Sequence, residues 1–423
     1  PGVRTPPVTD VLVIGAGLAG LVAGWQAAER GLSTIVLAKG WGATHWHAGC
    51  IDVLGYDPAG SETPVESPTE AVAKRVRDNP DHPYAIIGLE ALAESLEAFK
   101  ALCARSGYPL QGSLERNWLL PSALGTARPT CLAPETMIAG DLRRRDPMLL
   151  VGFEQLPDFF PGLAAENLVS LGLLANAITL DLPSLRARRF VYPSILAQLF
   201  ESQAFREEVV AALKPRLGES GRVGFPAVLG VHDALGVKND LQDRLGIEVF
   251  EIPGLPPSIP GIRLHNLLVA AIEQAGGRVY NGMQALSAET DGSRILSVLS
   301  EAAARQKSNR AGKFVLATGG VLGGGFIGNP QGELLETIFG LPLAAPDGRD
   351  RWFSQEFLDP QGHPLFRSGL RVDANLKPVD ESAQVLHENL FSAGTCLSGA
   401  DYLVERSFEG VALATGFTVG KNV

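Results

Sequence analysis

Three glycines near the start of the chain have the spacing of a phosphate-binding turn. Gly15, Gly17 and Gly20 form a G-x-G-x-x-G pattern directly after the apolar run Val11–Ile14. Such glycines allow a tight strand-to-helix turn, close approach of the backbone to a pyrophosphate, and close packing of helix on strand. A helix that starts here presents free N–H groups and its positive end to an anion. The expected cofactor-binding residues of this turn are Gly15, Ala16, Gly17, Leu18, Ala19 and Gly20.

The elements that must position this turn can be read on both sides of it. The apolar run predicts a buried strand, and the segment from Leu18 to about Arg30 predicts a helix with an apolar face. Gly31 stands where a glycine commonly ends a helix. Thr34–Leu37 predicts a second strand, which completes the start of a βαβ unit. This context favours a nucleotide site, and the alternative is a tight turn in an unrelated α/β protein.

The end of the second strand bears on which nucleotide is bound. Dinucleotide sites commonly place an acidic residue about 20 positions after the glycines, on the adenosine ribose. Ala38 stands there instead, followed by Lys39 and Gly40, which we also expect at the cofactor. The missing carboxylate argues against a standard NAD or FAD adenosine pocket. It leaves open a mononucleotide, or FAD that is held by other contacts.

Composition excludes several classes of function. The net charge of −10, without long acidic blocks, argues against a nucleic-acid partner. The four cysteines are scattered and form no C-x-x-C pair, so we expect no metal site and no iron–sulfur cluster in this chain. That cysteine usage favours a reducing cytoplasm. No apolar run reaches the length of a membrane span, so contact with a membrane would be through partners.

The order of predicted elements indicates two α/β regions, one inserted in the other. Residues from about 111 to 245 have their own strand and helix pattern. The chain then continues with an amphipathic helix over 260–277 and a hairpin at Asp291-Gly292. A buried strand from Lys313 follows, and it ends in the expected cofactor residues Thr318, Gly319 and Gly320.

We therefore predict an α/β protein with a discontinuous Rossmann-like domain of the two-dinucleotide-binding flavoprotein type. This domain would consist of residues 1–110 and 246–423. An α/β cap-type domain for the substrate would be inserted at 111–245.

The C-terminal segment Glu388–Thr395 resembles the Asn-Leu-Phe-Ala-Ala-Gly signature of the fumarate reductase/succinate dehydrogenase flavoprotein class. A closer resemblance is to the B subunit family of anaerobic glycerol-3-phosphate dehydrogenases. It covers nearly the whole chain, and Leu255–Leu264 is its most specific block. The other segments that carry it are Gly15–Gly20, His82–Tyr84, Phe314–Gly325, Ile338–Leu341, Arg351–Phe353, Leu376–Pro378 and Glu388–Gly394.

This resemblance implies an electron-transfer flavoprotein with FMN as cofactor and FAD as the alternative. Ala38 fits FMN better than FAD. The implied activity is that of a glycerol-3-phosphate dehydrogenase complex with quinone as the eventual acceptor. A catalytic FAD-bearing A subunit would oxidise sn-glycerol 3-phosphate to dihydroxyacetone phosphate, and a membrane-associated iron–sulfur C subunit would pass the electrons on. The implied location is cytoplasmic, peripheral to the inner membrane through these partners.

The resemblance also adds cofactor residues near the C-terminus. A helix that starts near Gly410 would direct its positive end at the isoalloxazine ring. The residues implied here are Gly394, Gly399, Asp401, Gly410 and Val411. Family members have a run of glycines before this helix, whereas the present chain has Arg406-Ser-Phe-Glu-Gly410.

Other side chains are weighed one by one. Arg263, on the first turn of a helix, is a candidate for a substrate anion or the flavin edge, and pairing with a neighbouring acid is equally consistent. His45 and His47 could act as acid or base beside the flavin, although loop packing fits them better. No residue is assigned to catalysis. The residues to which we give structural or surface roles are Cys50, Ser258, His265, Arg351, Arg367, His387, Cys396 and Arg406.

Two other functions stay open. One is a self-sufficient FAD-dependent dehydrogenase or reductase of the fumarate reductase type. It would need an arginine and histidine at the flavin that the sequence does not clearly show. The other is a structural subunit that has lost its flavin. The bulkier Ser407–Glu409 loop, which replaces the glycines of the family, is the feature that supports this alternative.

Overall fold

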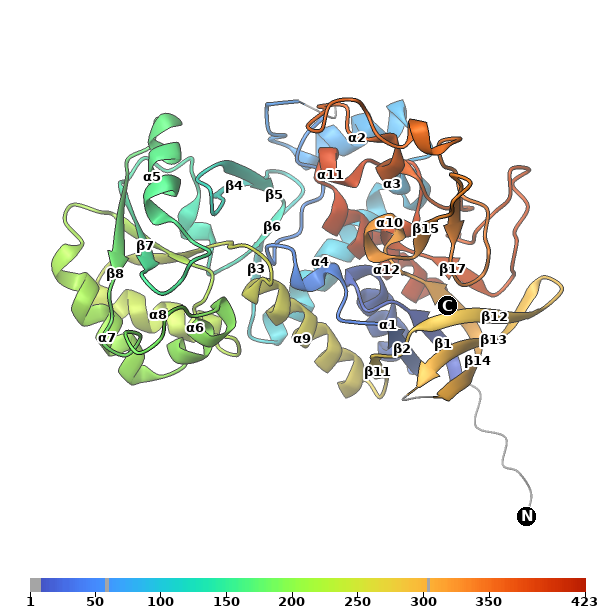
Figure 1. Ribbon diagram of the computed structural model, residues 1–423, viewed down its shortest axis with the longest axis horizontal. Helices are drawn as coiled ribbons and strands as arrows, with labels where there is room; N and C mark the ends of the chain where they lie inside the picture. The colour runs from blue at the N-terminus through green and yellow to red at the C-terminus, as the bar shows by residue number, and fades with distance from the viewer. Residues whose placement is uncertain (1–8, 58–60, 303–304) are drawn as a thin grey trace, which may run out of the picture.

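The computed structural model describes residues 9–57, 61–302 and 305–423, and its strands form two main β-sheets in adjoining bodies (Figure 1). The larger sheet has the order β11-β2-β1-β14-β13-β12, and β17 pairs with β14. Its strands are β1 (Thr9–Ile14), β2 (Thr34–Ala38), β11 (Arg278–Asn281), β12 (Ala285–Asp291), β13 (Arg294–Ala302), β14 (Arg305–Leu316) and β17 (Leu390–Ser392).

Strand β1 lies at the centre of this sheet and pairs in parallel with β2 and β14. Its residues Val11–Ile14 are at most 3% exposed, which agrees with the continuous apolar run that predicted a buried parallel strand. The outer half of β14 turns to pair antiparallel with β13, and the predicted hairpin joins β12 to β13 at Gly292. The parallel strands β11, β2, β1, β14 and β17 therefore form the Rossmann-like part of the sheet.

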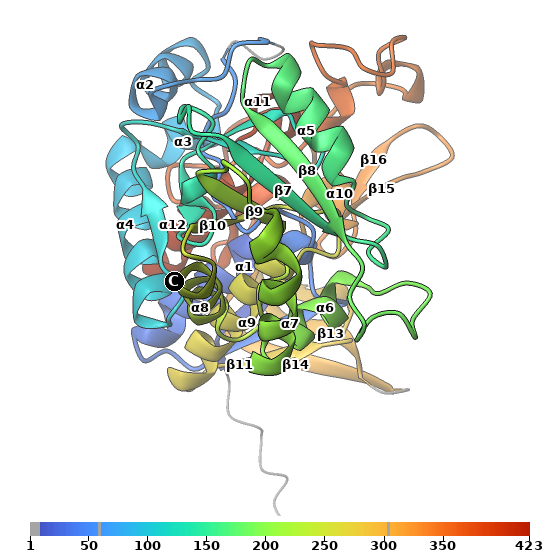
Figure 2. The same cartoon turned by 90° about the vertical axis from the view of Figure 1, so that its left-hand side faces the viewer.

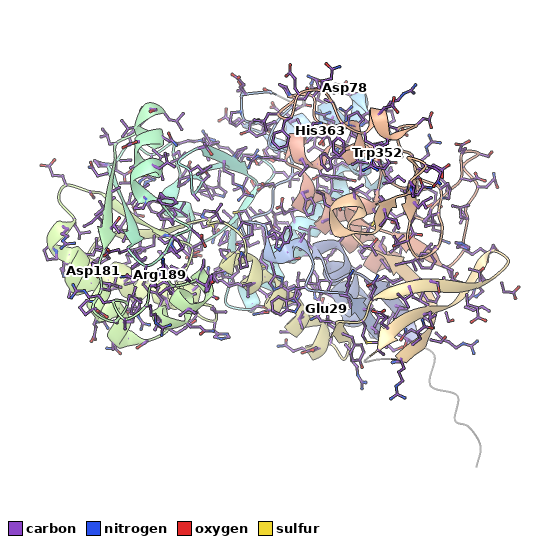
Figure 3. The ribbon with its side chains drawn as sticks, viewed as in Figure 1. Glu29, Asp78, Asp181, Arg189, Trp352 and His363 are labelled. Carbon is purple, nitrogen blue, oxygen red and sulfur yellow. The ribbon has the colours of Figure 1, made fainter. Side chains whose placement is uncertain are left out.

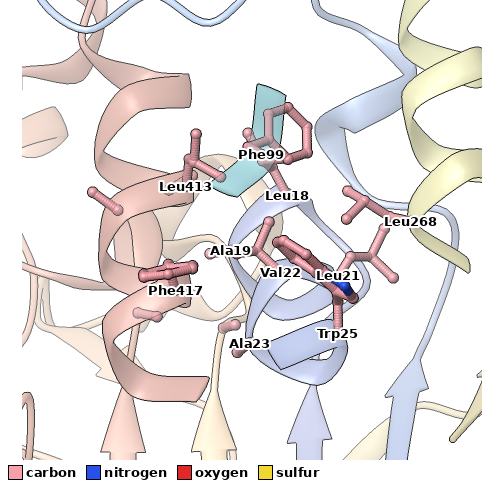
Figure 4. Packing of buried hydrophobic residues seen from close by; sticks show 14 of the residues in the cluster. Leu18, Ala19, Leu21, Val22, Ala23, Trp25, Phe99, Leu268, Leu413 and Phe417 are labelled. Carbon is pink, nitrogen blue, oxygen red and sulfur yellow. The ribbon is translucent and has the colours of Figure 1, made fainter. Parts of the chain in front are cut away.

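Helix α1 (Leu18–Glu29) packs between α9 (Ile259–Gln274) and α12 (Phe408–Asn422), as Figure 4 shows. The α1–α12 contact is so close that a Cβ at Gly416 would lie 2.4 Å from the carbonyl oxygen of Ala19. Glycine is therefore required where the two backbones meet. This contact joins the C-terminal part of the described chain to the β1–α1 unit near its start.

The smaller sheet is fully parallel, with the order β10-β9-β7-β8 and helices on its faces (Figure 2). It has its own hydrophobic core. One strand of this sheet, β10, lies after residue 245, the predicted end of the inserted domain. The division into domains at residues 110 and 245 stays a prediction. The elements of this body are β7 (Met148–Phe153), β8 (Ala175–Leu180), β9 (Arg222–Pro226), β10 (Glu248–Ile252), α5 (Pro161–Ser170), α6 (Pro193–Phe200), α7 (Gln203–Leu213) and α8 (Ala234–Leu245).

Further helices and strands complete the described part of the structure. No helix within the described ranges is long and apolar enough to cross a membrane. The remaining helices are α2 (Pro68–Asp78), α3 (Pro83–Ile87), α4 (Leu89–Arg105), α10 (Gly320–Gly323) and α11 (Tyr402–Glu405). The remaining strands are β3 (Leu110–Gly112), β4 (Trp118–Pro121), β5 (Ala127–Thr130), β6 (Leu132–Pro134), β15 (Phe326–Gly328) and β16 (Leu334–Glu336).

Candidate functional site

A cavity of about 1850 Å³ opens where the β1–α1 turn, the end of β2, the end of β14 and the start of α12 come together. Strand β5 and the loop before α9 close it from the side of the smaller sheet. The predicted cofactor residues that line this cavity are Gly15, Ala16, Gly17, Leu18, Ala19, Lys39, Gly40, Thr318, Gly319 and Gly394. The structure thus brings together positions that are far apart in the sequence.

The first two glycines of the motif have different roles in the turn. Gly15 has a φ of +114°, and a Cβ there would lie 2.2 Å from the carbonyl oxygen of Ala317, so this position is restricted to glycine. Gly17 is the N-cap of α1 and has no side-chain cap, and a Cβ there would meet nothing within 4 Å. The N-terminus of α1 therefore faces open space in the cavity, which fits a phosphate group.

Large apolar side chains line the same cavity although they are exposed. Trp41 and Trp46 are 61% and 70% exposed. Leu255, Leu322 and Leu403 are also exposed and line it. A ligand with flat apolar surface would cover these side chains, as a flavin would. The residues present therefore fit a flavin nucleotide.

Six predicted cofactor residues lie behind the cavity wall. A Cβ on Gly20, Gly320, Gly399 or Gly410 would come within 2.0–2.4 Å of a neighbouring oxygen, so these glycines serve close packing. Val411 is fully buried. Asp401 caps α11 by accepting a hydrogen bond from the Val404 N–H, and it pairs with Arg367 at 3.4 Å. None of these six is among the lining residues.

Arg263 also lies outside the cavity lining, because its guanidinium is fully occupied elsewhere. It donates to both carboxylate oxygens of Glu251 at 2.7 and 2.9 Å, twice to the carbonyl of Gly230, and to the hydroxyl of Tyr108. Its side chain is 3% exposed. All five N–H groups thus have protein partners, which leaves no donor for a substrate or flavin. The structure therefore agrees with the second interpretation of Arg263, in which it pairs with a neighbouring acid, here Glu251.

The histidines His45, His47 and His265 line the cavity together. Burial, together with the charge of Arg128 and the ring of His45, lowers the pKa of His47 to about 3, so it is neutral near pH 7. Its Nδ1 accepts a hydrogen bond from the Gly49 N–H, which places the proton of the neutral ring on Nε2. Burial also lowers the pKa of His265, to about 4. These rings are neutral hydrogen-bonding groups.

A charged cluster that the sequence did not predict lines the cavity nearby. Arg128 on β5 donates to Asp52 at 2.6 Å, and Glu409 lies in the first turn of α12. The N–H of Gly410 donates to the carbonyl of Asp52 at 2.9 Å, which fixes the start of α12 against this cluster. Burial and the nearby Asp52 carboxylate raise the pKa of Glu409 to about 8, so its carboxyl is protonated at neutral pH.

The signal for this cluster was present but weak. Asp52 interrupts the apolar run Cys50–Leu54, and Glu409 precedes an apolar helix. A carboxylate in such surroundings is a candidate for an unusual pKa. Arg128 gives no such signal, because only the fold brings β5 to the cavity.

Most of the residues expected to have structural or surface roles do have structural surroundings. Ser258 caps α9 through the Gly261 N–H, and Cys396 accepts a hydrogen bond from the Gly319 N–H. Burial raises the pKa of Cys50 to about 12, which keeps it as a thiol. Of the arginines, Arg406 lines the cavity, whereas Arg351 and Arg367 do not; nor does His387. Among residues 9–57, 61–302 and 305–423, no group of three potential metal ligands is found.

Comparison with known proteins supports a flavoprotein. The family model described as FAD binding domain matches residues 10–406. A protein of Halobacterium salinarum named as a probable B subunit of anaerobic glycerol-3-phosphate dehydrogenase is 35% identical over 425 residues, with 97% of each chain covered. The B subunits of the anaerobic glycerol-3-phosphate dehydrogenases of Mannheimia succiniciproducens and Pectobacterium atrosepticum are 30% and 31% identical, with 98% of each chain covered.

These matches confirm the predicted flavoprotein fold class and the resemblance found in the sequence. The chain belongs to the FAD binding domain family and, within it, to the B subunit family of anaerobic glycerol-3-phosphate dehydrogenases.

Proposed function

We propose that this chain is a flavin-dependent electron-transfer subunit of an anaerobic glycerol-3-phosphate dehydrogenase complex. The observation that carries the proposal is the uncapped N-terminus of α1 at Gly17, which opens into the large cavity shared with the ends of β2 and β14. A bound flavin would accept two electrons and release them singly. The complex would oxidise sn-glycerol 3-phosphate to dihydroxyacetone phosphate and pass electrons to quinone.

The partners in this proposal are a catalytic A subunit that carries FAD and an iron–sulfur C subunit at the inner membrane. The relatives are named as B subunits, which supports a complex of several different chains. This chain would then be peripheral to the membrane through its partners.

The residues proposed to hold the flavin are those at the cavity wall. Gly15–Ala19 would bind phosphate through the backbone, Lys39 and Gly40 would lie beside the nucleotide, and Thr318, Gly319 and Gly394 would lie along the far side. We propose FMN as the cofactor, because Ala38 at the end of β2 offers no carboxylate to an adenosine ribose.

FAD is the second candidate for the cofactor. The cavity continues past Ala38 along Asn281 and Met283–Ala285, and its volume exceeds the roughly 300–1000 Å³ of ordinary ligand pockets. The matching family model is that of an FAD binding domain. Both observations favour a longer nucleotide.

A self-sufficient dehydrogenase is the second candidate for the function. It requires an arginine and a histidine at the flavin, and Arg128 and His47 line the same cavity. Glycerol-3-phosphate oxidation by this chain alone, measured with an artificial electron acceptor, would favour it. Activity only after addition of the A subunit would favour the electron-transfer role.

The first experiment is a visible spectrum of the purified chain, followed by chromatography of the released cofactor. Near-stoichiometric FMN is the expected result. If FAD is found instead, it replaces FMN as the proposed cofactor and favours the self-sufficient dehydrogenase as the function. A colourless chain that also fails to take up FMN or FAD would contradict both functions and leave the structural subunit.

A further inference from the structure

Six buried polar atoms on residues of the cavity wall have no hydrogen-bond partner within the part of the chain that the structure describes. Three of them are Nη1 of Arg128, Oδ1 of Asp52 and Nε2 of His47, and the other three are Thr44 Oγ1, His45 Nδ1 and His265 Nδ1. Arg128 is 9% exposed and Asp52 is 4% exposed. A buried polar group without a partner costs roughly 1–3 kcal/mol, so six of them at one cavity indicate that ligands or ordered waters complete their hydrogen bonding. The atoms of Arg128, Asp52 and His47 are the three considered below.

The three atoms come from different parts of the fold. Arg128 lies on β5, while His47 and Asp52 lie on the segment that follows β2. The positive charge of Arg128 contributes to the low pKa of His47, and Arg128 donates its other terminal nitrogen to Asp52 at 2.6 Å. Arg128 and Asp52 are thus in direct contact, and His47 lines the same cavity.

Their chemistry defines what they could bind. Arg128 Nη1 is a donor, and His47 Nε2 is a donor because its ring is neutral with Nδ1 accepting from Gly49. Asp52 Oδ1 is an acceptor. Two donors suit a carbonyl or hydroxyl oxygen, and an acceptor suits a hydroxyl hydrogen on the same small molecule.

The charge balance decides against a highly charged ligand. Arg128 and Asp52 neutralise each other across their hydrogen bond, and His47 carries no charge near pH 7. Glu409, at the same wall, is protonated below about pH 8. A phosphate dianion bound by Arg128 and His47 would lie beside the Asp52 carboxylate, with which Arg128 is already paired. Arg406 also lines the cavity, but its guanidinium lies over the ring of Tyr56. Repulsion between unit charges at 4 Å is about 4 kcal/mol at an effective dielectric constant of 20.

We propose that Arg128, His47 and Asp52 form a binding site in this chain for the uncharged oxygen groups of a small hydroxycarbonyl or polyol. The inference deepens the proposed function, on which it rests for the flavin that shares the cavity. It gives this chain a small-molecule site of its own beside the cofactor.

The test is calorimetric titration of the full flavin-loaded chain with hydroxyacetone, with the visible flavin spectrum as a second readout. Saturable binding that perturbs the spectrum is expected. The variants H47F and R128K should each weaken binding about tenfold or more, since a lost hydrogen bond to a buried partner is worth about 1.4 kcal/mol. R128K keeps the charge that pairs with Asp52, and H47F keeps an aromatic ring.

The matched control is R186K. Arg186 pairs with Asp181, which Figure 3 places on the outer edge of the smaller-sheet body, and neither residue lines the cavity. Hydroxyacetone binding in this variant should equal that of the unchanged chain. Thermal unfolding of each variant shows whether it is folded. If R128K does not fold, the test is made with H47F alone.

Three results would overturn the site: no saturable binding of hydroxyacetone, unchanged binding in the folded variants, or displacement of hydroxyacetone by inorganic phosphate at equal concentration. The flavin content of each sample separates this inference from the proposed function. A flavin-loaded chain that does not bind hydroxyacetone contradicts only the proposed small-molecule site. A chain that binds no flavin but binds hydroxyacetone through His47 contradicts only the flavin function.

Discussion

At the scale of single residues, two glycines of one motif are expected to respond differently to the same substitution. The change Gly17→Ala places a methyl group in open space at the proposed phosphate site, where φ is −75°. It should raise the flavin dissociation constant at least tenfold while costing about 1 kcal/mol or less of stability at the N-cap. Flavin titration and thermal unfolding measure the two effects.

Gly20→Ala is the matched variant. Its Cβ would lie 2.0 Å from the carbonyl oxygen of Gly15, so the strand-to-helix turn has to move. We expect a large loss of thermal stability, or failure to fold. Unchanged flavin binding in the Gly17 variant together with normal folding of the Gly20 variant would contradict the assignment of this turn.

The buried carboxyl of Glu409 should give the protein a measurable pH dependence. Its pKa is raised from 4.5 to about 8 by burial and by Asp52, with Arg128 and Arg406 opposing. The folded state therefore holds more protons than the unfolded state between these values, and stability falls as pH rises through this window. His47 and His265 have lowered pKa values and act in the opposite direction, but only below about pH 6.5.

The useful window is thus about pH 6.5 to 8. In urea unfolding, the unchanged chain should lose stability across it, and Glu409→Gln should lose distinctly less. Equal slopes in both proteins would show that Glu409 is ionised in the folded state throughout. The flavin content of each sample is kept equal, because bound ligand also stabilises the folded state.

At the scale of elements, the contact of α1 with α12 depends on a glycine inside a helix. Gly416→Ala adds up to about 1 kcal/mol of helix propensity. It also puts a Cβ 2.4 Å from the Ala19 carbonyl, and overpacking of this kind costs about 1–3 kcal/mol. Because the opposing atom belongs to a helix backbone, we expect the overpacking to prevail and the melting temperature to fall.

Lys421→Ala on the same helix is the control. Lys421 is half-exposed and pairs with Glu94 at the surface, so its loss should leave the melting temperature nearly unchanged. A Gly416 variant that is as stable as this control would mean that α1 and α12 can separate without loss.

The elements that could be predicted from the sequence are those with local signals. The apolar run before Gly15 and the Asp291-Gly292 turn marked β1 and the β12–β13 hairpin, and both are present. The helix expected over 260–277 is present as α9, but it ends at Gln274, three residues earlier. Local sequence patterns thus located elements better than their ends.

The candidate site divides in the same way. Nine predicted residues line the cavity because each follows a strand or starts a helix, which is a local property, and a tenth, Gly394, was implied by the family resemblance. Arg128 comes to the cavity only because the segment with β5 folds back onto the larger sheet's body, and no spacing in the sequence encodes that contact. Arg263 was wrongly considered for the site because the sequence does not show its partner. That partner, Glu251, lies on β10, and only the fold reveals the pair.

At the scale of the whole molecule, the buried pair of Arg263 and Glu251 joins α9, which packs on α1, to β10 of the smaller sheet. Glu251 also accepts hydrogen bonds from the Thr136 hydroxyl at 2.7 Å and the Leu229 N–H at 2.9 Å. One carboxylate thus ties together several segments at the junction of the two bodies. Removal of its cation would leave a charge buried there.

Arg263→Met should therefore destabilise the protein by about 3–5 kcal/mol, the usual effect of breaking a buried ion pair from one side. The double variant with Glu251→Gln should recover part of this loss, because no charge is then left buried. Flavin affinity, measured well below the unfolding temperature, should stay close to that of the unchanged chain, since Arg263 lies outside the cavity lining. A folded, stable Arg263→Met variant with greatly weakened flavin binding would restore Arg263 to the site and contradict its role at this junction.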